Sequence, residues 1–237
     1  TVYRGYADEW QRIWNLKLRE HKVDIERAML FGQRASVGGI QYTEGIVGHI
    51  IAEGAAPATD TTKLSYTEGK AYHKSIAAGS MTYDNLLGDF EVVFDPARGG
   101  GSSKLALCSL PVISLFNKMG NGGFLDNSTV DTQAQYMLER AQGSFGHKVM
   151  KIDTVHGDLT LVKEPLFRGL SSTFMAMVDL DHVSYRPLVG NGINRDTAIT
   201  TNVQQADEDL RKDLILTEAG LEVSLPETHA LFNFEGA

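Results

Sequence analysis

The segment that most constrains the fold is residues 6–31, which reads as one long amphipathic helix. Its apolar and aromatic residues recur every three or four positions and so share one face of a helix: Trp10, Trp14, Leu18, His21, Ile25 and Ala28/Met29. Gly32 follows directly and fits a helix stop. At about 1.5 Å per residue the helix is a rod of roughly 39 Å. Two tryptophans on one face predict that it packs against a substantial partner surface.

The amino-acid composition excludes several classes of structure and function. The chain has 237 residues, 42% of them hydrophobic and 22% charged, as in a globular protein that buries a core. A single cysteine, Cys108, excludes an internal disulfide framework. We expect no transmembrane helix, since no apolar run approaches ~18 residues, and no signal peptide. A net charge of −8 argues against a tight direct grip on DNA.

Residues 32–70 are expected to be irregular or extended. The Gly38-Gly39 pair and the Ala/Thr/Pro-rich stretch 54–62 interrupt any regular pattern. So long an irregular segment is unusual in a compact enzyme domain, but it suits a protein whose surface lies against neighbouring molecules.

The middle of the chain predicts alternating helices and strands, hence an α+β fold. Thr82 can cap a helix that runs to Phe94, and residues 104–108 are predicted to form a buried strand. A second helix is expected to enter at Ser109–Pro111 and stop at Gly120-Asn121-Gly122-Gly123. Further strands are expected at 147–155, 159–163 and 173–178, the first two joined by a turn at His156-Gly157-Asp158.

The last forty residues predict a closing β-hairpin. Residues 207–216 can begin as a short helix, after which apolar residues alternate along two stretches separated by Pro226-Glu227. The alternating residues are Ile215, Ala219, Leu221, Val223 and Leu225, then Ala230, Phe232 and Phe234.

No pattern in the sequence predicts catalysis, a metal or a cofactor. None of the seven histidines pairs with another at a zinc-ligand spacing. Cys108 lies in an apolar strand and is interpreted as a core residue. The stretch 99–104 ends in Lys104 and is followed by a strand, so it lacks the order of a phosphate-binding loop. We therefore predict a non-enzymatic protein without cofactors.

Three stretches taken together resemble the major capsid proteins of tailed bacteriophages, which have the Hong Kong 97-type fold. The stretches are residues 18–40 (LREHKVDIERAMLFGQRASVGGI), residues 151–167 with 173–188 (KIDTVHGDLTLVKEPLF, TFMAMVDLDHVSYRPL), and residues 213–234 (DLILTEAGLEVSLPETHALFNF). Their order and spacing carry the resemblance. The family's N-terminal arm and extended hairpin loop, which precede the long helix, have no counterpart in residues 1–5, so the resemblance does not extend to inter-subunit clasping by those elements.

The resemblance implies a peripheral domain made of residues 1–74, with the spine helix 6–31, and of residues 201–237, with the closing β-hairpin of its sheet. Residues 75–200 would form an axial α/β domain. Copies would assemble into hexamers and pentamers of an icosahedral virion shell that encloses double-stranded DNA without binding it tightly. Portal proteins, and scaffold or decoration proteins, would be partners, assembly would take place in the host cytoplasm, and no membrane would be involved.

The residues expected to matter are therefore structural. They are Trp10, Trp14, Leu18 and Ile25 on the helix, Gly38 and Gly39 in the loop after it, and Leu221, Val223 and Phe232 near the end of the chain. Two alternatives remain open: an encapsulin-type compartment shell, which resembles the same fold but encloses cargo proteins, and an ordinary soluble α+β enzyme.

Overall fold

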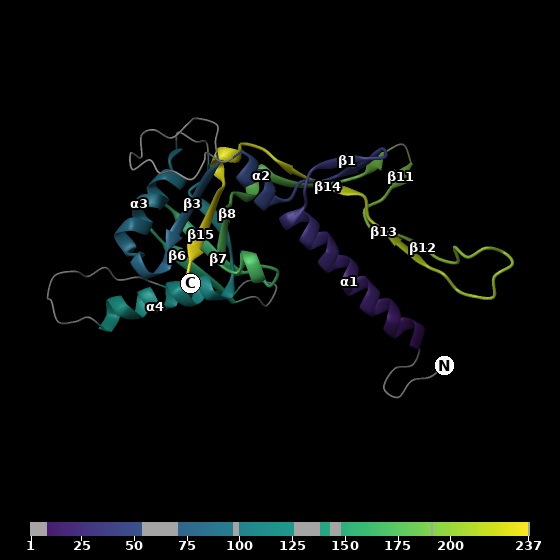
Figure 1. Ribbon diagram of the computed structural model, residues 1–237, viewed down its shortest axis with the longest axis horizontal. Helices are drawn as coiled ribbons and strands as arrows, with labels where there is room; N and C mark the ends of the chain where they lie inside the picture. The colour runs from purple at the N-terminus through teal and green to yellow at the C-terminus, as the bar shows by residue number, and fades with distance from the viewer. Residues whose placement is uncertain are drawn as a thin grey trace. The chain divides into compact units, whose positions relative to one another are not determined.

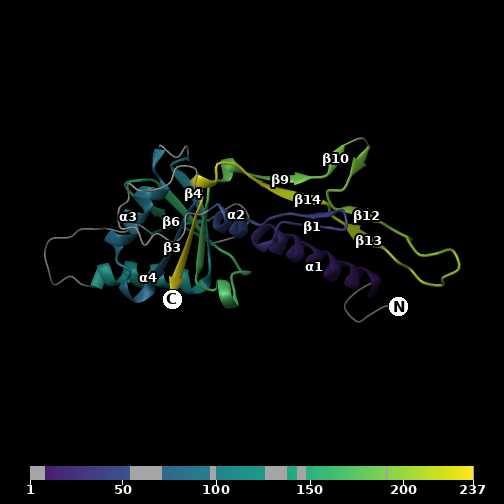
Figure 2. The ribbon, with the colours of Figure 1, turned by 45° about the horizontal axis from the view of Figure 1, so that its top comes forward.

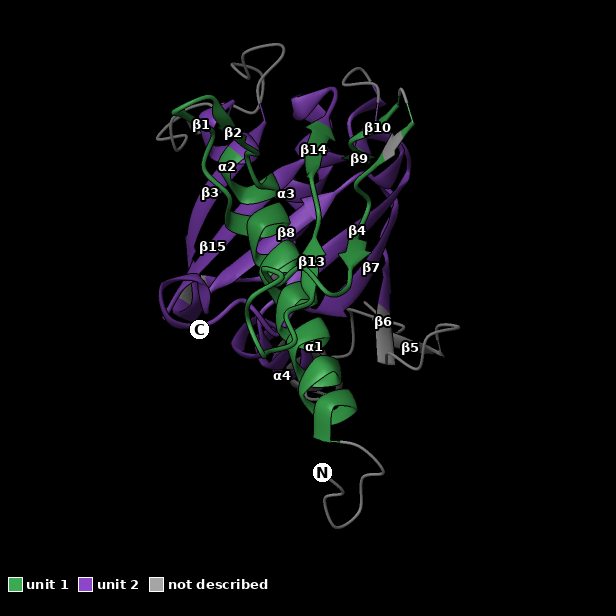
Figure 3. Ribbon diagram, turned by 90° about the vertical axis from the view of Figure 1, so that its right-hand side faces the viewer, with its two compact units in different colours: residues 1–48, 184–222 green, residues 49–183, 223–237 purple. Residues whose placement is uncertain are grey.

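The chain forms two compact units, each assembled from separate stretches of sequence (Figure 3). The computed structural model describes residues 9–53, 71–96, 100–125, 138–142, 148–190 and 192–236. Unit 1 consists of residues 1–48 and 184–222, and unit 2 of residues 49–183 and 223–237. The chain thus changes unit after residues 48, 183 and 222, whereas the sequence suggests domain boundaries after residues 74 and 200.

Unit 1 contains the long helix that the sequence predicts, α1 (Glu9–Phe31), seen as a continuous rod in Figure 1. The residues of its apolar stripe are half-buried, whereas Ile13, Leu16 and Val23 on other faces are exposed. The helix stops at Gly32, whose N–H donates to the Ala28 carbonyl over 2.9 Å. A Cβ at Gly32 would lie only 2.4 Å from that oxygen, so close backbone approach requires a glycine there.

The strands of unit 1 form two-stranded sheets. These are β1 (Ala35–Val37) with β2 (Ile40–Tyr42), β10 (Val189–Gly190) with β11 (Ile193–Asn194), β12 (Ala198–Thr200) with β13 (Leu214–Leu216), and β9 (Val183–Pro187) with β14 (Ala219–Val223). A short helix, α2 (Ile46–Ala52), follows β2. The extended strands of the β1–β2 hairpin agree with the expectation that residues 32–70 are irregular or extended, whereas the helix α2 corrects it. Residues 54–70 lie outside the described part of the chain.

Unit 2 is built on a seven-stranded mixed sheet, visible from two directions in Figures 1 and 2. In spatial order its strands are β3 (Tyr72–Ala77), β15 (Ala230–Glu235), β8 (Phe174–Val178), β4 (Ser103–Cys108), β7 (Asp158–Lys163), β6 (Lys148–Asp153) and β5 (Leu138–Gln142). The pairs β15–β3 and β4–β7 are parallel and the others antiparallel.

Two helices, α3 (Tyr83–Val93) and α4 (Leu110–Leu125), pack their apolar residues on this sheet. Alternate residues of the central strands complete the core with them, because successive side chains of a strand point to opposite faces. The core comprises Tyr72, Leu86, Phe90, Val93, Phe94, Ala106, Cys108, Val112, Phe116, Leu159, Leu161, Met175, Met177, Ala230, Phe232 and Phe234. Single 3-10 turns occur at Ala78–Ser80, Gly169–Ser171, Leu180–His182 and Pro226–Thr228.

Most of the elements predicted in this part of the chain are confirmed. Thr82 caps α3, since its hydroxyl oxygen accepts the Asn85 N–H over 3.3 Å. β4, β6, β7 and β8 lie where strands are expected, and residues 154–157 turn between β6 and β7. The predicted stop of α4 is wrong, because the helix continues through Gly120-Asn121-Gly122-Gly123 to Leu125.

The end of the chain differs most from the prediction. Residues 207–213, all within the described part of the chain, form no helix, and β14 and β15 do not pair as a closing hairpin. β14 pairs with β9, while β15 inserts between β3 and β8 in the sheet of unit 2. Leu225, at φ +45°, and the 3-10 turn that follows it separate the two strands. The alternation of apolar residues along a strand shows which face of the strand is buried, but it does not show which other strand pairs with it.

Candidate functional site

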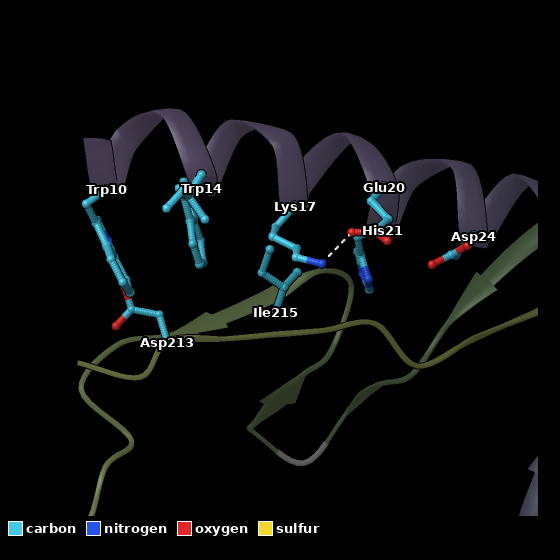
Figure 4. Close-up of a pocket in the computed structure, with 9 residues that line it drawn as sticks. Trp10, Trp14, Lys17, Glu20, His21, Asp24, Asp213 and Ile215 are labelled. Carbon is cyan, nitrogen blue, oxygen red and sulfur yellow. Dashed lines mark hydrogen bonds and ion pairs between the residues drawn. The ribbon is translucent and has the colours of Figure 1, made fainter. Parts of the chain in front are cut away.

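Unit 1 contains a groove of about 460 Å³ along the apolar stripe of α1 (Figure 4). Trp10 and Trp14 point from the helix towards the strand that contains Ile215. The lining residues are Trp10, Ile13, Trp14, Lys17, Glu20, His21, Asp24, Asp213 and Ile215. The predicted stripe therefore faces β13 and the residues that flank it.

Polar contacts join α1 to the segment around β13 near both ends of the groove. Near the start of the helix the Arg211 guanidinium lies over the Trp10 ring at 4.7 Å from its centroid, a cation–π arrangement. Arg211 also donates to the Asp213 carboxylate over 3.3 Å, and the Asn202 N–H donates to the same carboxylate over 3.0 Å. The Asp213 side chain is only 3% exposed, so it is a buried anchor of the loop that precedes β13.

Further along the helix, His21 Nε2 lies 2.8 Å from the Thr217 hydroxyl, within hydrogen-bonding distance. This contact joins the middle of α1 to the residue that follows β13, 196 positions away in sequence. The helix is thus held to the 211–217 segment by a cation–π contact and a hydrogen bond as well as by its apolar residues.

The charges that line the groove include a close ion pair. Lys17 Nζ lies 2.7 Å from Glu20 Oε2, the contact drawn as a dashed line in Figure 4. This hydrogen bond raises the pKa of Lys17 and lowers the pKa of Glu20. Both groups are therefore fully charged near neutral pH. The described residues that line the groove offer aromatic faces and exposed ion pairs, and they include no paired nucleophile and base.

The structure brings only some of the sequence-predicted residues together. Trp10, Trp14, Leu18 and Ile25 lie on one side of α1. Gly38 and Gly39, at φ +59° and +84°, form the two-residue turn of the β1–β2 hairpin, where left-handed backbone favours glycine.

The remaining predicted residues lie on two different strands. The Leu221 N–H donates to the Thr43 hydroxyl over 2.9 Å, and Val223 ends β14. Phe232 is fully buried in the core of unit 2, beside Tyr72 at a centroid distance of 5.6 Å. Sequence reasoning misses Arg211, Asp213 and Thr217 as partners of α1, because the stretch from residue 207 to 216 reads as the start of a helix.

Unit 2 contains a second polar arrangement, which is buried. Lys104 Nζ donates to the Thr228 carbonyl over 2.6 Å and lies 3.8 Å from Asp179 Oδ2. The Gly101 N–H donates to the same carboxylate over 2.8 Å. Burial alone would raise the pKa of Asp179, but backbone N–H donors and the Lys104 ammonium outweigh it and hold the pKa below its usual value.

His229 completes this buried group. Its Nδ1 accepts the Asp179 N–H over 3.2 Å, so the neutral ring carries its proton on Nε2. Burial, and then the nearby Lys104 ammonium, lower the pKa of His229 to about 4. The Lys104 side chain points into this network and is fully buried, which excludes it as the lysine of a phosphate-binding loop.

Cys108, another residue that could have carried chemistry, also has a structural role. Cys108 is fully buried, and burial raises the pKa of its thiol, as expected for a core residue. Within the described ranges, no group of three or more His, Cys, Asp or Glu side chains is placed to hold a metal ion. No helix in the part of the chain that the structure describes is long and apolar enough to cross a membrane.

Exposed apolar residues are concentrated in unit 1. Among the described residues, 14 of the 20 large hydrophobic side chains that are exposed belong to it. They occur on α1, on the β1–β2 hairpin and on the ribbons that follow residue 184: Ile13, Leu16, Val23, Val37, Ile40, Tyr42, Tyr185, Leu188, Val189, Ile199, Val203, Leu210, Leu214 and Leu216. Where such exposed side chains adjoin one another, they form the kind of apolar surface that mediates protein–protein contact.

Comparison with known proteins finds a matching family model and similar solved structures. A family model described as SU10 major capsid protein matches residues 2–234. A chain from Mycobacterium phage Patience superimposes with a TM-score of 0.55 at 13% identity, covering 98% of this chain and 67% of the other. A chain from the capsid of an empty GTA particle gives a TM-score of 0.55 at 10% identity, covering 96% of this chain and 66% of the other.

No curated protein sequence matches the chain. The chain spans about two thirds of the length of the two solved structures, so each of them contains substantial additional sequence. The likeness to these phage and capsid chains confirms the α+β fold of the Hong Kong 97 type that the sequence resemblance implies.

Proposed function

Because the chain belongs to the SU10 major capsid protein family, we propose that its copies assemble into hexamers and pentamers of an icosahedral phage head that encloses double-stranded DNA. Its role in the particle is structural rather than enzymatic. The observation that carries this proposal is the family match over residues 2–234 of a chain whose unit 1 exposes most of its large apolar side chains.

The two units correspond to different roles in such a shell. We assign unit 1, which contains the spine helix α1 and the paired ribbons, to the peripheral domain. Unit 2, which contains the seven-stranded sheet, is assigned to the axial domain near the five- or six-fold axis. The well-buried core of unit 2 supports this assignment, because a self-sufficient domain can hold its shape where several copies converge.

The negative net charge of the chain supports a shell that encloses DNA without binding it tightly. The chain carries 30 acidic and 22 basic residues, a net charge of −8. Attraction to phosphate is strong at low salt and would hinder both packaging and release of DNA. Portal proteins, and scaffold or decoration proteins, are further partners that a phage head of this kind implies, and the virion is the place where the chain would act.

The direct test is to purify the protein and examine it by negative-stain electron microscopy. Closed shells with five-fold vertices are expected, and particles formed in cells that replicate the phage should contain nuclease-protected DNA. Shells filled with a co-purified enzyme would instead indicate an encapsulin-type compartment. A protein that stays monomeric at high concentration and at every salt and pH tested would contradict the proposal.

A further inference from the structure

Two exposed surfaces of unit 1 have complementary chemistry, and the inference drawn from them rests on the proposed function. The first surface is the loop of residues 201–213 between β12 and β13, here called the acidic loop. The second is the row of residues on α1 that faces away from β13, here called the outer row.

The acidic loop presents carboxylates beside aliphatic side chains. Asp207, Glu208 and Asp209 are exposed, and none of them forms an ion pair with a residue that the structure describes. Leu210, the next residue, is 51% exposed, and Val203 is 42% exposed. The Val203 N–H donates to the Lys212 carbonyl over 2.8 Å, so the two arms of the loop are bonded to each other.

The outer row presents cations beside aliphatic side chains. It consists of Arg12, Leu16, Arg19, Val23 and Arg27, whose spacings of three and four residues place them on one face of α1. Leu16 is 50% exposed and Val23 is 39% exposed.

Not all cations of this face are engaged within the chain. Arg12 pairs with Glu9, and Arg27 lies 3.8 Å from Asp24. Arg19 and the neighbouring Lys22 form no ion pair with any described residue. They outnumber Glu26, the one carboxylate of α1 that is likewise without an ion pair among the described residues. This side of the helix therefore has an excess of positive charge beside its exposed leucine and valine.

The two surfaces cannot satisfy each other within one copy. The apolar stripe of α1 packs towards β13, so the ribbon that carries the acidic loop lies along the inner side of the helix (Figure 4). The outer row is on the opposite side of the same helix. A loop on one side and a matching row on the other can meet only between copies.

We propose that the acidic loop of one copy docks on the outer row of α1 of a second copy. Leu210 and Val203 cover Leu16 and Val23, while the carboxylates of the loop face Arg19 and Lys22. Such a head-to-tail contact joins two different surfaces, so it repeats from copy to copy and generates rings or extended arrays. This is the kind of contact that a shell built from rings requires.

Charge reversal tests the proposal. The double variant Arg19→Glu/Lys22→Glu and the double variant Asp207→Lys/Asp209→Lys should each reduce the yield of particles about tenfold or more at physiological ionic strength, because each puts like charges in contact. The matched control is Lys163→Glu/Arg168→Glu in unit 2, which replaces two exposed cations in the same way as the helix variant. It should assemble as the wild type does.

Restoring assembly by combining the two charge reversals is stronger evidence for the contact than the loss caused by either reversal alone. A chain that carries both reversals should regain most of the particle yield, because each reversed loop then meets a reversed outer row. Particles would be counted by electron microscopy after sedimentation, and thermal melts of unassembled subunits would show that all variants fold.

The outcomes separate this contact from the proposed function. If the wild type forms shells and both double variants form them equally well, the contact is refuted and the capsid function stands. If reversal of the outer row abolishes only the encapsidated DNA while reversal of the loop has no effect, the row faces nucleic acid and the contact is again refuted. Failure of the wild type to assemble would count against the proposed function itself.

Discussion

Unit 2 buries its apolar residues among its own strands and helices, whereas unit 1 leaves most of them on the surface. Among the described residues, only Leu30, Ile46 and Val47 of unit 1 are buried apolar side chains, and unit 2 supplies all the others. The sheets differ in the same sense. Unit 2 has seven strands in one sheet, while the strands of unit 1 are paired two by two.

The comparison shows where each unit finds its stability. A two-stranded hairpin is marginally stable in water, and independent stability needs more strands or a packed helix. In the described part of unit 1, α1 is the long helix that can pack against the two-stranded ribbons. The ribbons still leave apolar side chains in water: Val37 is 65% exposed and Ile40 is 60% exposed. We infer that unit 2 is the self-stabilised part of the subunit and that unit 1 gains much of its order from neighbouring copies.

The largest expected effect comes from the core of unit 2. Phe232→Ala should lower the free energy of unfolding of the unassembled subunit by about 3–5 kcal/mol, because the ring is fully buried and its removal leaves a cavity. Urea unfolding followed by circular dichroism measures this. In unit 1, Ile199→Ala removes a side chain that is 52% exposed. Its cost should be no more than about 0.5 kcal/mol. Equal costs for the two variants would break the comparison between the units.

The next effect concerns pH and is also confined to unit 2. His229 is neutral in the folded state with a pKa of about 4, whereas the unfolded chain takes up that proton near pH 6.5. The unfolded state thus binds more protons below pH 6.5, and the free energy of unfolding should fall by roughly 3 kcal/mol as the pH drops from about 6.5 to about 4. Burial lowers the pKa of His73 in the same direction.

Urea titrations at about pH 7, 5.5 and 4.5 would measure this loss, and hydrogen exchange would localise it. His229→Gln should flatten the profile in this acidic range, while His156→Gln, in the turn before β7, serves as the control substitution. A wild-type profile that is already flat over this interval would show that His229 is not held neutral by unit 2.

A smaller effect is expected at the groove of unit 1. Trp14→Ala removes a half-buried indole that lines an open groove, so its cost should be roughly 2 kcal/mol, below the about 3–5 kcal/mol typical of a fully buried tryptophan. Thermal melts of unassembled subunits measure it. Leu16→Ala, on the outer row of the same helix, should leave the melt nearly unchanged and reduce the yield of particles. An unchanged melt for Trp14→Ala together with lost particles would mean that the tryptophan faces another copy.

The sequence predicts the elements better than their partners, for a physical reason. The period of the α1 stripe is a local property, so Trp10, Trp14 and Ile25 can be placed on one face from the sequence alone. The surface that this face meets is remote, as the 196 positions between His21 and its partner Thr217 show. Residues 207–216 (DEDLRKDLIL) are rich in helix-forming types, and the burial of Asp213 in this segment is a tertiary effect that local propensity does not report.

The buried polar group of unit 2 is hidden from sequence reasoning for the same reason. Lys104 lies at the start of an apolar strand, and nothing within that strand shows that its ammonium bonds to the Thr228 carbonyl 124 residues away. Alternation of apolar residues likewise identifies Phe232 and Leu221 as strand residues, but it does not show that β15 and β14 belong to different sheets.

The smallest expected effect is at the turn of the β1–β2 hairpin. Gly39 has φ +84°, and a Cβ there would meet no heavy atom within 4 Å, so Gly39→Ala adds backbone strain without a clash. The strain of a left-handed conformation is about 1 kcal/mol. Gly79→Ala in unit 2 is the matched control, since a Cβ there also meets open space and the backbone is not left-handed.

Hydrogen exchange of residues 35–42 and urea unfolding together distinguish two results for Gly39→Ala. If the substitution lowers global stability by about 1 kcal/mol, the hairpin unfolds with the rest of the subunit. That result would weaken the contrast between the units, because the ribbons of unit 1 would then share the stability of the core. If the substitution removes protection from residues 35–42 alone, the hairpin is held only locally before assembly, and the contrast becomes sharper.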